Sequence, residues 1–427
     1  MTAPRIPVEL VAPVFNPVTF AQPAVVHELF TRLRREYPLA IAEVPGYDPH
    51  WIVTRHADLR EITRQDALFH GGDRSKTLIS QAGEALVKQF TGGQSNIFRS
   101  LVQLDPPEHG AYRGVLSANF MPDKIMALKE DVRVTARHFV DRLAALGTEC
   151  DFATDIAFRY PLKVVLDLVG VPEQDHEFML DLTHWLFSYA DPDLKRPGSD
   201  LTDPQEITRT WDIVFNRFKD YYEPVIADRR RQPRADLASL IANGKVFGHE
   251  LEERAMVSYF VIISTAGHDT TAATTATGMW LLAERPELLA RLKAEPGLIA
   301  GFVEETIRWA SPVQQFVRSA VEDYAIGGQT IRKGDLVYLS YVSANRDEAV
   351  FERPFEFDPT RSPNRHIGFG YGAHICLGQH LARLEMKSFW EALLPRLEHV
   401  EMAGEGKYTE SEFVSGPKSV PIRYRMR

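Results

Sequence analysis

The stretch from His366 to Lys387, HIGFGYGAHICLGQHLARLEMK, places four glycines around Cys376 and a histidine two residues before it. The chain has only one other cysteine, Cys150. A single cysteine at the start of an amphipathic helix is most often a buried apolar residue. That interpretation leaves the glycines unexplained, so the stretch predicts more specific chemistry.

Three functional interpretations fit this stretch poorly. A structural zinc site needs four ligands in paired spacings, but only His374, Cys376 and His380 stand close together. A dinucleotide-binding loop must follow a buried strand, whereas the residues at 358–366 read DPTRSPNRH. A Cys–His nucleophilic pair is assembled in space, so the closeness of His374 in sequence carries little weight.

Ligation of a haem iron by a thiolate uses every feature of the stretch. Glycines at 370, 372 and 378 let the backbone approach a flat, wide porphyrin. Phe369 offers an aromatic ring near the sulfur, and the helix that follows Cys376 stabilises a thiolate through its free N–H groups and dipole. Hydrogen bonds to that sulfur tune the iron.

The segment FGYGAHICLG at 369–378 resembles the haem-binding loop of the cytochrome P-450 family, whose pattern is Phe-Gly-x-Gly-x-x-x-Cys-x-Gly. Every fixed position matches. The resemblance implies haem b as the cofactor, Cys376 as its axial thiolate ligand, and Phe369 and Gly370 beside the ring. It also implies the family's fold, a prism-like and mainly α-helical domain, with a smaller β-rich part, that encloses the haem.

Three distant segments match the family in the same order, and the first is EETIR. It contains Glu305 and Arg308, which share one face of a helix. Read alone, the two form an ordinary surface ion pair. The resemblance implies a buried pair joined by Arg361, which braces the haem loop and takes no part in catalysis.

The second segment, AGHDTT at 266–271, interrupts a long apolar stretch with polar residues. Read alone, its threonines bond back to helix carbonyls. The resemblance implies that Asp269 and Thr270 are catalytic residues that relay protons through water beside the oxygen site. It also implies that the small Ala266 leaves room for dioxygen above the ring.

The third segment, DPPEHGAYRG at 105–114, places His109 and Arg113 four residues apart on a short helix. Read alone, they belong to a solvated helix face. The resemblance implies that both bind haem propionates, together with Arg318 and His374. Two propionates carry two negative charges, so several cationic or donor side chains must converge on them.

The pattern of apolar residues predicts more helices than strands. One strand is expected over 50–55. Two more are expected within 329–343, joined by a Lys-Gly-Asp turn. No repeat or long linker is evident, so we expect residues 1–427 to form a single domain, mainly α with a smaller β-rich part. Helical spacing recurs over 24–36, 122–146, 173–188, 205–229, 250–284, 286–310 and 377–395.

Composition limits the classes of function. The formal net charge of −9 argues against nucleic-acid binding. Two widely separated cysteines suggest no disulfide framework and a cytoplasmic protein. The start, MTAPRIPVELVAPVF, resembles no signal peptide or membrane anchor. The apolar segment 255–284 carries His268 and Asp269 at its middle, which favours one long buried helix over a membrane span.

The resemblance implies a monooxygenase that hydroxylates its substrate with dioxygen and two electrons. With no anchor and no fused reductase expected, the chain resembles the bacterial class served by an iron–sulfur ferredoxin and its reductase. Ferredoxins are acidic, which makes Arg113, Arg383 and Lys387 candidates for the docking face. Two alternatives stay open: a peroxygenase that uses hydrogen peroxide, and a haem protein that binds ligands without turnover.

Four segments resemble the terpene-oxidising branch of the family, the α-terpineol hydroxylases: GYDPHW (46–51), AGHDTT, YVSANRDEAVF (341–351) and FVSGPKSVPIR (413–423). They imply a compact apolar substrate, either a terpenoid or a small aromatic hydrocarbon. Residues 70–100, rich in Gly, Ser and Gln, are expected to form a mobile cover over the pocket. The pocket residues carried over by position, each equally explained by plain core packing, are Phe98, Thr265, Ala266, Val313, Gln314, Phe316, Phe413 and Val414.

Overall fold

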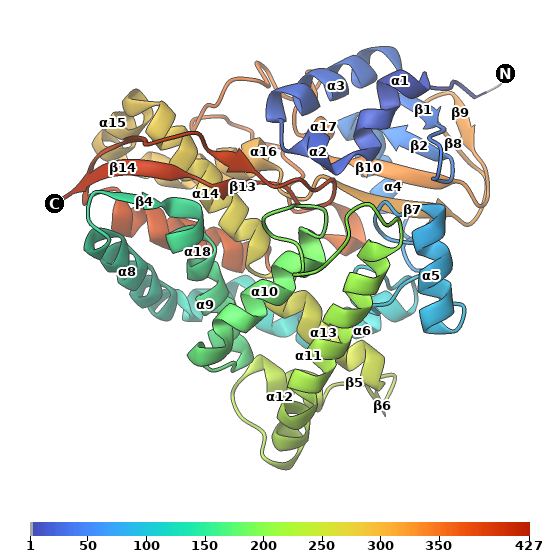
Figure 1. Ribbon diagram of the computed structural model, residues 1–427, viewed down its shortest axis with the longest axis horizontal. Helices are drawn as coiled ribbons and strands as arrows, with labels where there is room; N and C mark the ends of the chain where they lie inside the picture. Colours follow the sequence, from blue (N-terminus) through green and yellow to red (C-terminus); the bar gives the residue numbers. More distant parts are fainter. Residues whose placement is uncertain (1–2) are drawn as a thin grey trace.

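The computed structural model describes residues 3–427 and is built mostly of helices. Figure 1 shows the main sheet gathered beside the N-terminal helices, while the remaining helices fill the larger part of the molecule. The expectation of a mainly α fold with a smaller β-rich part is confirmed. The helices are α1 Val8–Val11, α2 Pro17–Phe20, α3 Pro23–Glu36, α4 His56–Arg64, α5 Gln81–Thr91, α6 Glu108–Ser117, α7 Pro122–Ala127, α8 Lys129–Ala145, α9 Arg159–Val169, α10 His176–Phe187, α11 Glu206–Arg231, α12 Leu237–Ala242, α13 Glu253–Ala266, α14 Asp269–Glu284, α15 Pro286–Ala294, α16 Ile299–Ala310, α17 Tyr341–Ala344 and α18 Gln379–Leu393.

The main sheet has five strands in the order β1-β2-β10-β7-β3. Its neighbours pair antiparallel except β2 and β10, which run parallel. A second sheet, β11-β14-β4, joins the C-terminal strands to a strand from the middle of the chain. The strands are β1 Leu39–Ala42, β2 His50–Val53, β3 Phe69–His70, β4 Glu149–Asp151, β5 Lys245–Val246, β6 His249–Glu250, β7 Gln315–Ala320, β8 Tyr324–Ile326, β9 Gln329–Ile331, β10 Leu336–Ser340, β11 Leu397–Met402, β12 Lys407–Tyr408, β13 Pro417–Ser419 and β14 Pro421–Met426.

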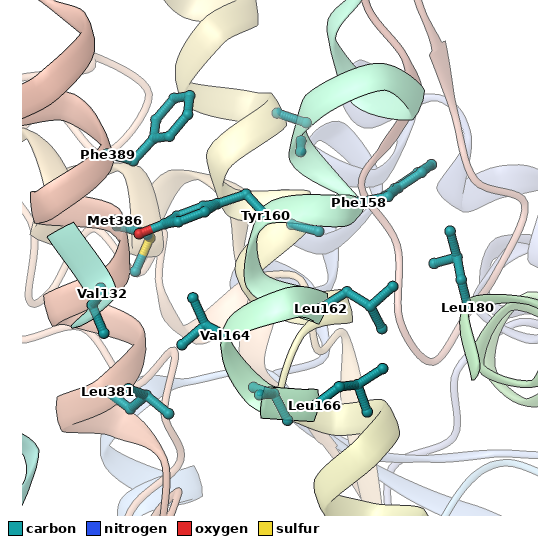
Figure 2. Close-up of a cluster of buried hydrophobic side chains, with 14 of the residues drawn as sticks. Val132, Phe158, Tyr160, Leu162, Val164, Leu166, Leu180, Leu381, Met386 and Phe389 are labelled. Atoms are coloured by element: carbon teal, nitrogen blue, oxygen red, sulfur yellow. The ribbon is translucent and has the colours of Figure 1, made fainter. Parts of the chain in front are cut away.

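The helical core is centred on α9, which is buried on both sides. In Figure 2, Tyr160 and Val164 point toward α18, while Leu162 points toward α10. The Tyr160 hydroxyl donates to the Glu385 carbonyl of α18 at 2.9 Å. Full burial of an apolar side chain such as Leu162 or Val164 stabilises the fold by about 1.5–3 kcal/mol. This packing holds α18, the helix that follows Cys376, in a defined position.

The long helix expected over 250–284 is interrupted. It is divided into α13 and α14 at Gly267 and His268. The His268 N–H bonds to the Thr265 carbonyl, three residues back, at 3.3 Å. The His268 ring bonds to the Ser264 carbonyl at 2.9 Å. Polar side chains that take up helix carbonyls bend a helix, which accounts for the break.

Other expected elements are present with different limits or partners. The helix expected over 286–310 is divided into α15 and α16 by Pro296 and Gly297, and the one over 122–146 into α7 and α8 at Leu128. Both strands expected within 329–343 form, but β9 pairs with β8, and β10 pairs with β2 and β7. Within residues 3–427, no helix has the length and apolarity needed to cross a membrane.

Candidate active site

A large cavity lies between the Cys376 loop and the two parts of the broken helix. Its internal volume is about 310 Å³, within the range of pockets that bind small molecules. Most of the wall is apolar. The loop at 368–378 forms one part of it, and α13, α14, β7 and segments 95–98, 100–103 and 413–414 form the rest.

Cys376 faces this cavity just before α18. Its side chain is exposed to the cavity, and its N–H donates to the Phe369 carbonyl at 2.8 Å. Burial within the protein raises the pKa of the Cys376 thiol, while the Gly378 N–H and the guanidinium groups of Arg113 and Arg383 oppose that rise. The loop and the helices α6 and α18 therefore supply the donor and cations that stabilise a thiolate, although burial outweighs them for the free thiol.

The glycines of the loop serve the loop's own fold as well as the cavity. Gly370 and Gly372 have φ angles of +75° and +78°, a region that residues with a Cβ rarely adopt. A Cβ at Gly372 would overlap the Thr63 carbonyl of α4. Gly372 does not line the cavity. The expectation that this glycine makes room for the porphyrin is therefore corrected: it makes room for α4.

The four side chains expected at the propionates converge on one part of the cavity. The rings of His109 and His374 stack with centroids 4.0 Å apart. Burial, and next the charge of Arg318, lowers the pKa of His374 to about 2. Burial and the charge of Arg113 lower the pKa of His109. The two arginines therefore disfavour a positive charge on either histidine ring.

The same cluster has unused hydrogen-bonding atoms. Among residues 3–427, both ring nitrogens of His374 and the Nε2 of His109 are buried without a partner. The Leu101 carbonyl lies near His374 but does not complete a hydrogen bond. Each such buried group costs about 1–3 kcal/mol. Two carboxylates would remove that cost, so these residues fit haem b, with Cys376 at its iron and its propionates at this cluster.

Glu305, Arg308 and Arg361 are in direct contact. Glu305 and Arg308 have fully buried side chains, joined by bonds of 2.7 and 2.8 Å. Arg361 Nε donates to both Glu305 oxygens at 3.1 and 3.2 Å. Arg308 also donates to backbone carbonyls between residues 345 and 356. The three residues tie α16 to the segment that leads into the Cys376 loop.

Asp269 and Thr270 do not share one space. Thr270 and Ala266 line the large cavity, and the Thr270 hydroxyl donates to the Ala266 carbonyl at 3.4 Å. Asp269 lies instead at a small separate cavity beside His184. Burial there raises the pKa of Asp269 to about 7. Consecutive helix residues are turned by roughly 100° from each other, which explains the separation.

Nearly all the expected pocket residues line the large cavity. Gln314 is the exception, and its assignment to the pocket is corrected. Its side-chain amide donates to the Ser311 carbonyl at 2.9 Å. Neighbouring residues in extended backbone point to opposite sides, so the inward position of Val313 turns Gln314 away. The residues that line the cavity as expected are Phe98, Thr265, Ala266, Val313, Phe316, Phe413 and Val414.

The three docking candidates differ in how they present their charge. The Lys387 side chain is 51% exposed. Arg383 is ion-paired with Glu304 at 2.6 Å. Arg113 donates to the Ile375 carbonyl at 2.8 Å and lines the cavity. All three have internal contacts, since Lys387 also pairs with Glu391 at 3.7 Å, but Lys387 has the longest of these contacts and a side chain that is half exposed.

Lys76 is a cavity residue that the sequence did not identify. It lines the large cavity, is 2% exposed, and has no hydrogen-bond partner for its ammonium group among residues 3–427. It stands in the polar run DRSKTLIS at 73–80, where no motif marks it. Only contacts between distant segments show that it faces inward.

Comparison with known proteins agrees with this geometry. The cytochrome P450 family model matches residues 7–422. Cytochrome P450-terp of a Pseudomonas species is 44% identical over 419 residues, which are 98% of each chain. Linalool 8-monooxygenase of Pseudomonas putida is 30% identical, over 95% of this chain and 97% of its own. The crystal structure of CYP108D1 from Novosphingobium aromaticivorans has a TM-score of 0.90 at 38% identity, covering 99% of this chain and 100% of that one.

These matches confirm the resemblance that the Cys376 loop carries. The family binds haem b through a cysteine thiolate, and it acts on organic substrates with dioxygen and a redox partner. Because the family model spans nearly the whole chain and the relatives include named monooxygenases, we conclude that this protein belongs to the cytochrome P450 family and is a haem-dependent monooxygenase.

Proposed function

We propose that this enzyme hydroxylates a compact apolar substrate, a terpenoid or a small aromatic hydrocarbon, with two electrons from an iron–sulfur ferredoxin and its reductase. The observation that carries the proposal is the cavity wall. Phe98, Phe316 and Phe413 share one cavity with Thr270 and Cys376. Apolar side chains select a substrate by buried area and shape. The names P450-terp and linalool 8-monooxygenase support the terpenoid assignment.

In this proposal the Cys376 thiolate would hold the haem iron, and the haem, when bound, would supply the activation of dioxygen. Arg113 and Arg318, with His109 and His374, would hold the propionates. Phe369 and Gly370 would contact the ring. These groups act before chemistry begins, because they set the position of the cofactor relative to the substrate.

Proton delivery is assigned to α14. Thr270 is the first residue of α14 that lines the large cavity. Its hydroxyl can both accept and donate a hydrogen bond, so it can order water there. Asp269 holds a proton on the other side of the helix. Its raised pKa of about 7 keeps a proton available near neutral pH.

Three further roles belong to the proposal. Glu305, Arg308 and Arg361 brace the loop. Lys387 contributes to the ferredoxin docking face, and residues 70–100 form the mobile cover. A cytoplasmic location is supported by the two cysteines, both of which are free.

The test is reconstitution with a ferredoxin and its reductase. Terpenoids and small aromatic hydrocarbons are titrated while the haem absorption band is followed, and ligands that shift it are assayed for product. Hydroxylation that requires both dioxygen and the reduced ferredoxin supports the proposal. Product formed from hydrogen peroxide alone indicates a peroxygenase, and binding without product indicates a ligand-binding protein.

The ligand assignment has a matched control in the second cysteine. Cys376→Ser should remove the absorption signature of a thiolate-bound haem, whereas Cys150→Ser should keep it. Cys150 lies in β4 and does not line the cavity. Retention of the thiolate signature in Cys376→Ser would contradict the assignment.

A further inference from the structure

Lys76 is held by its backbone so that its side chain enters the cavity. The Val317 N–H of β7 donates to the Lys76 carbonyl at 2.7 Å. The Lys76 N–H donates to the Asn96 side-chain oxygen at 3.4 Å. The residue is 2% exposed and lines the cavity. Contacts with two other segments of the chain therefore fix the Lys76 backbone, and the buried side chain lines the cavity.

The ammonium group of Lys76 is buried without a counter-charge. It has no hydrogen-bond partner among residues 3–427. Asp105, an acid of the neighbouring loop, directs its two oxygens to the Gly71 and Gly72 N–H groups at 2.7 and 2.8 Å, and neither oxygen is hydrogen-bonded to the Lys76 ammonium. The ammonium lies 5.4 Å from the Phe316 ring centroid. An aromatic face does not replace the counter-charge that a buried cation requires.

Lys76 and Arg318 gather around the same ring. Phe316 and Arg318 are two residues apart in β7, so their side chains lie on the same face of the strand. The Arg318 guanidinium lies 5.9 Å from the Phe316 ring centroid. Lys76 thus adds a further unpaired cation to the cavity, next to the cluster assigned to the propionates. The group that satisfies an ammonium by both charge and hydrogen bonding is a carboxylate.

We propose that Lys76 binds a carboxylate inside the large cavity. The carboxylate comes either from a haem propionate or from an acidic substrate. The first source depends only on haem binding. The second rests on the proposed function and extends its substrate class to terpenoid acids. Two measurements separate these sources, and only the second needs a substrate-like ligand.

The first measurement follows haem release. Lys76→Met keeps the length of the side chain and removes its charge. Transfer of haem to an apoglobin in excess should be about tenfold faster from Lys76→Met than from wild type, if a propionate is the partner. Lys88→Met is the matched control, because the Lys88 side chain lies on α5 and is 46% exposed. Its release rate should equal that of wild type.

The second measurement compares a terpenoid carboxylic acid with its methyl ester. Each is titrated against the haem absorption band of wild type and of Lys76→Met. If a substrate is the partner, wild type should bind the acid about tenfold more tightly than the ester, and Lys76→Met should lose this preference. Haem release would then be unchanged. Unchanged haem release together with an unchanged acid-to-ester ratio overturns the proposal.

A charge-keeping variant covers the case in which Lys76→Met does not accumulate as folded protein. Lys76→Arg is then compared with wild type by resonance Raman spectroscopy of the propionate bending modes. A shifted band supports the propionate source, and a preference of wild type for the acid over the ester supports the substrate source. An unshifted band with no preference in wild type overturns the proposal.

Discussion

Asp269 and Thr270 are consecutive residues of α14, yet their side chains line two different cavities. The cavity beside Asp269 has an internal volume of about 10 Å³, roughly the space of one water molecule. His184 lines it as well, and its Nε2 is buried without a partner among residues 3–427. The helix therefore separates a buried carboxyl with a raised pKa from a hydroxyl that faces the large cavity.

Replacement of Thr270 should uncouple electron use from hydroxylation. In Thr270→Ala the cavity loses the hydroxyl that orders water, so protons reach the oxygen site without control. We expect product formed per electron consumed to fall by about tenfold or more. The measurement is product yield against reduced ferredoxin consumed.

Thr275→Ala is the control for this experiment. Thr275 lies on the same helix, is buried, and donates to the Thr271 carbonyl at 2.8 Å, but it does not line the cavity. Its yield should match wild type. An unchanged yield in Thr270→Ala would show that Thr270 has no part in the relay.

Replacement of Asp269 should change how stability depends on pH. Burial raises the pKa of Asp269 to about 7, whereas an unfolded chain titrates this group near about 3.9. Between these values the folded state keeps the proton and the unfolded state has lost it, so rising pH favours unfolding. Wild type should lose stability across this window relative to Asp269→Asn, by up to about 1.4 kcal/mol per pKa unit.

Denaturant midpoints of the holoenzyme measured from about pH 4 to about pH 7 report this difference. Asp220→Asn, on an exposed position of α11, should follow the wild-type curve. Parallel curves for wild type and Asp269→Asn would mean that the Asp269 carboxyl does not titrate in this window.

Replacement of Glu305 should destabilise the protein strongly. Glu305→Gln leaves the buried charges of Arg308 and Arg361 without a counter-charge, which costs about 3–5 kcal/mol. Haem loss should also become faster, because the segment leading to the Cys376 loop is released. The unfolding midpoint and the haem release rate check both effects.

Glu398→Gln provides the comparison for Glu305→Gln. Glu398 also has two arginine partners, Arg425 and Arg427 at 2.8 and 3.1 Å, but this network lies at the surface. Exposed ion pairs contribute little, so its midpoint should stay close to wild type. Similar small shifts in both variants would argue against a bracing role for Glu305.

Charge reversal at Lys387 should slow reduction by the ferredoxin. The Lys387 side chain is 51% exposed on α18, so Lys387→Glu adds repulsion and breaks only the 3.7 Å surface pair with Glu391, which contributes little to stability. The loss of rate should be greatest at low salt and shrink as salt screens the charges. Stopped-flow reduction of the haem across a salt series measures it.

Lys245→Glu, in the β5–β6 hairpin, makes the same charge change on another element and should leave the rate unchanged. Arg383→Glu is a poorer test, because it also breaks the ion pair with Glu304. Equal rates for wild type and Lys387→Glu at low salt would remove Lys387 from the docking face.

The amino-acid sequence by itself determined the chemistry of this protein. A thiolate ligand loop depends on residue types at short, fixed spacings, and the segment from Phe369 to Gly378 carries all of them. The pair Glu305 and Arg308 is likewise set by helical spacing. The mainly α fold followed from the spacing of apolar residues, which is also a pattern within short segments of the chain.

Only the tertiary structure decided which way the side chains face. Asp269 and Gln314 were expected in the large cavity and lie outside it, while Lys76 was not expected there and lines its wall. Each outcome depends on contacts between segments far apart in the chain, such as β7 against the loop that carries Lys76. A local pattern gives residue type and spacing, but the direction of a side chain follows from what packs against its backbone.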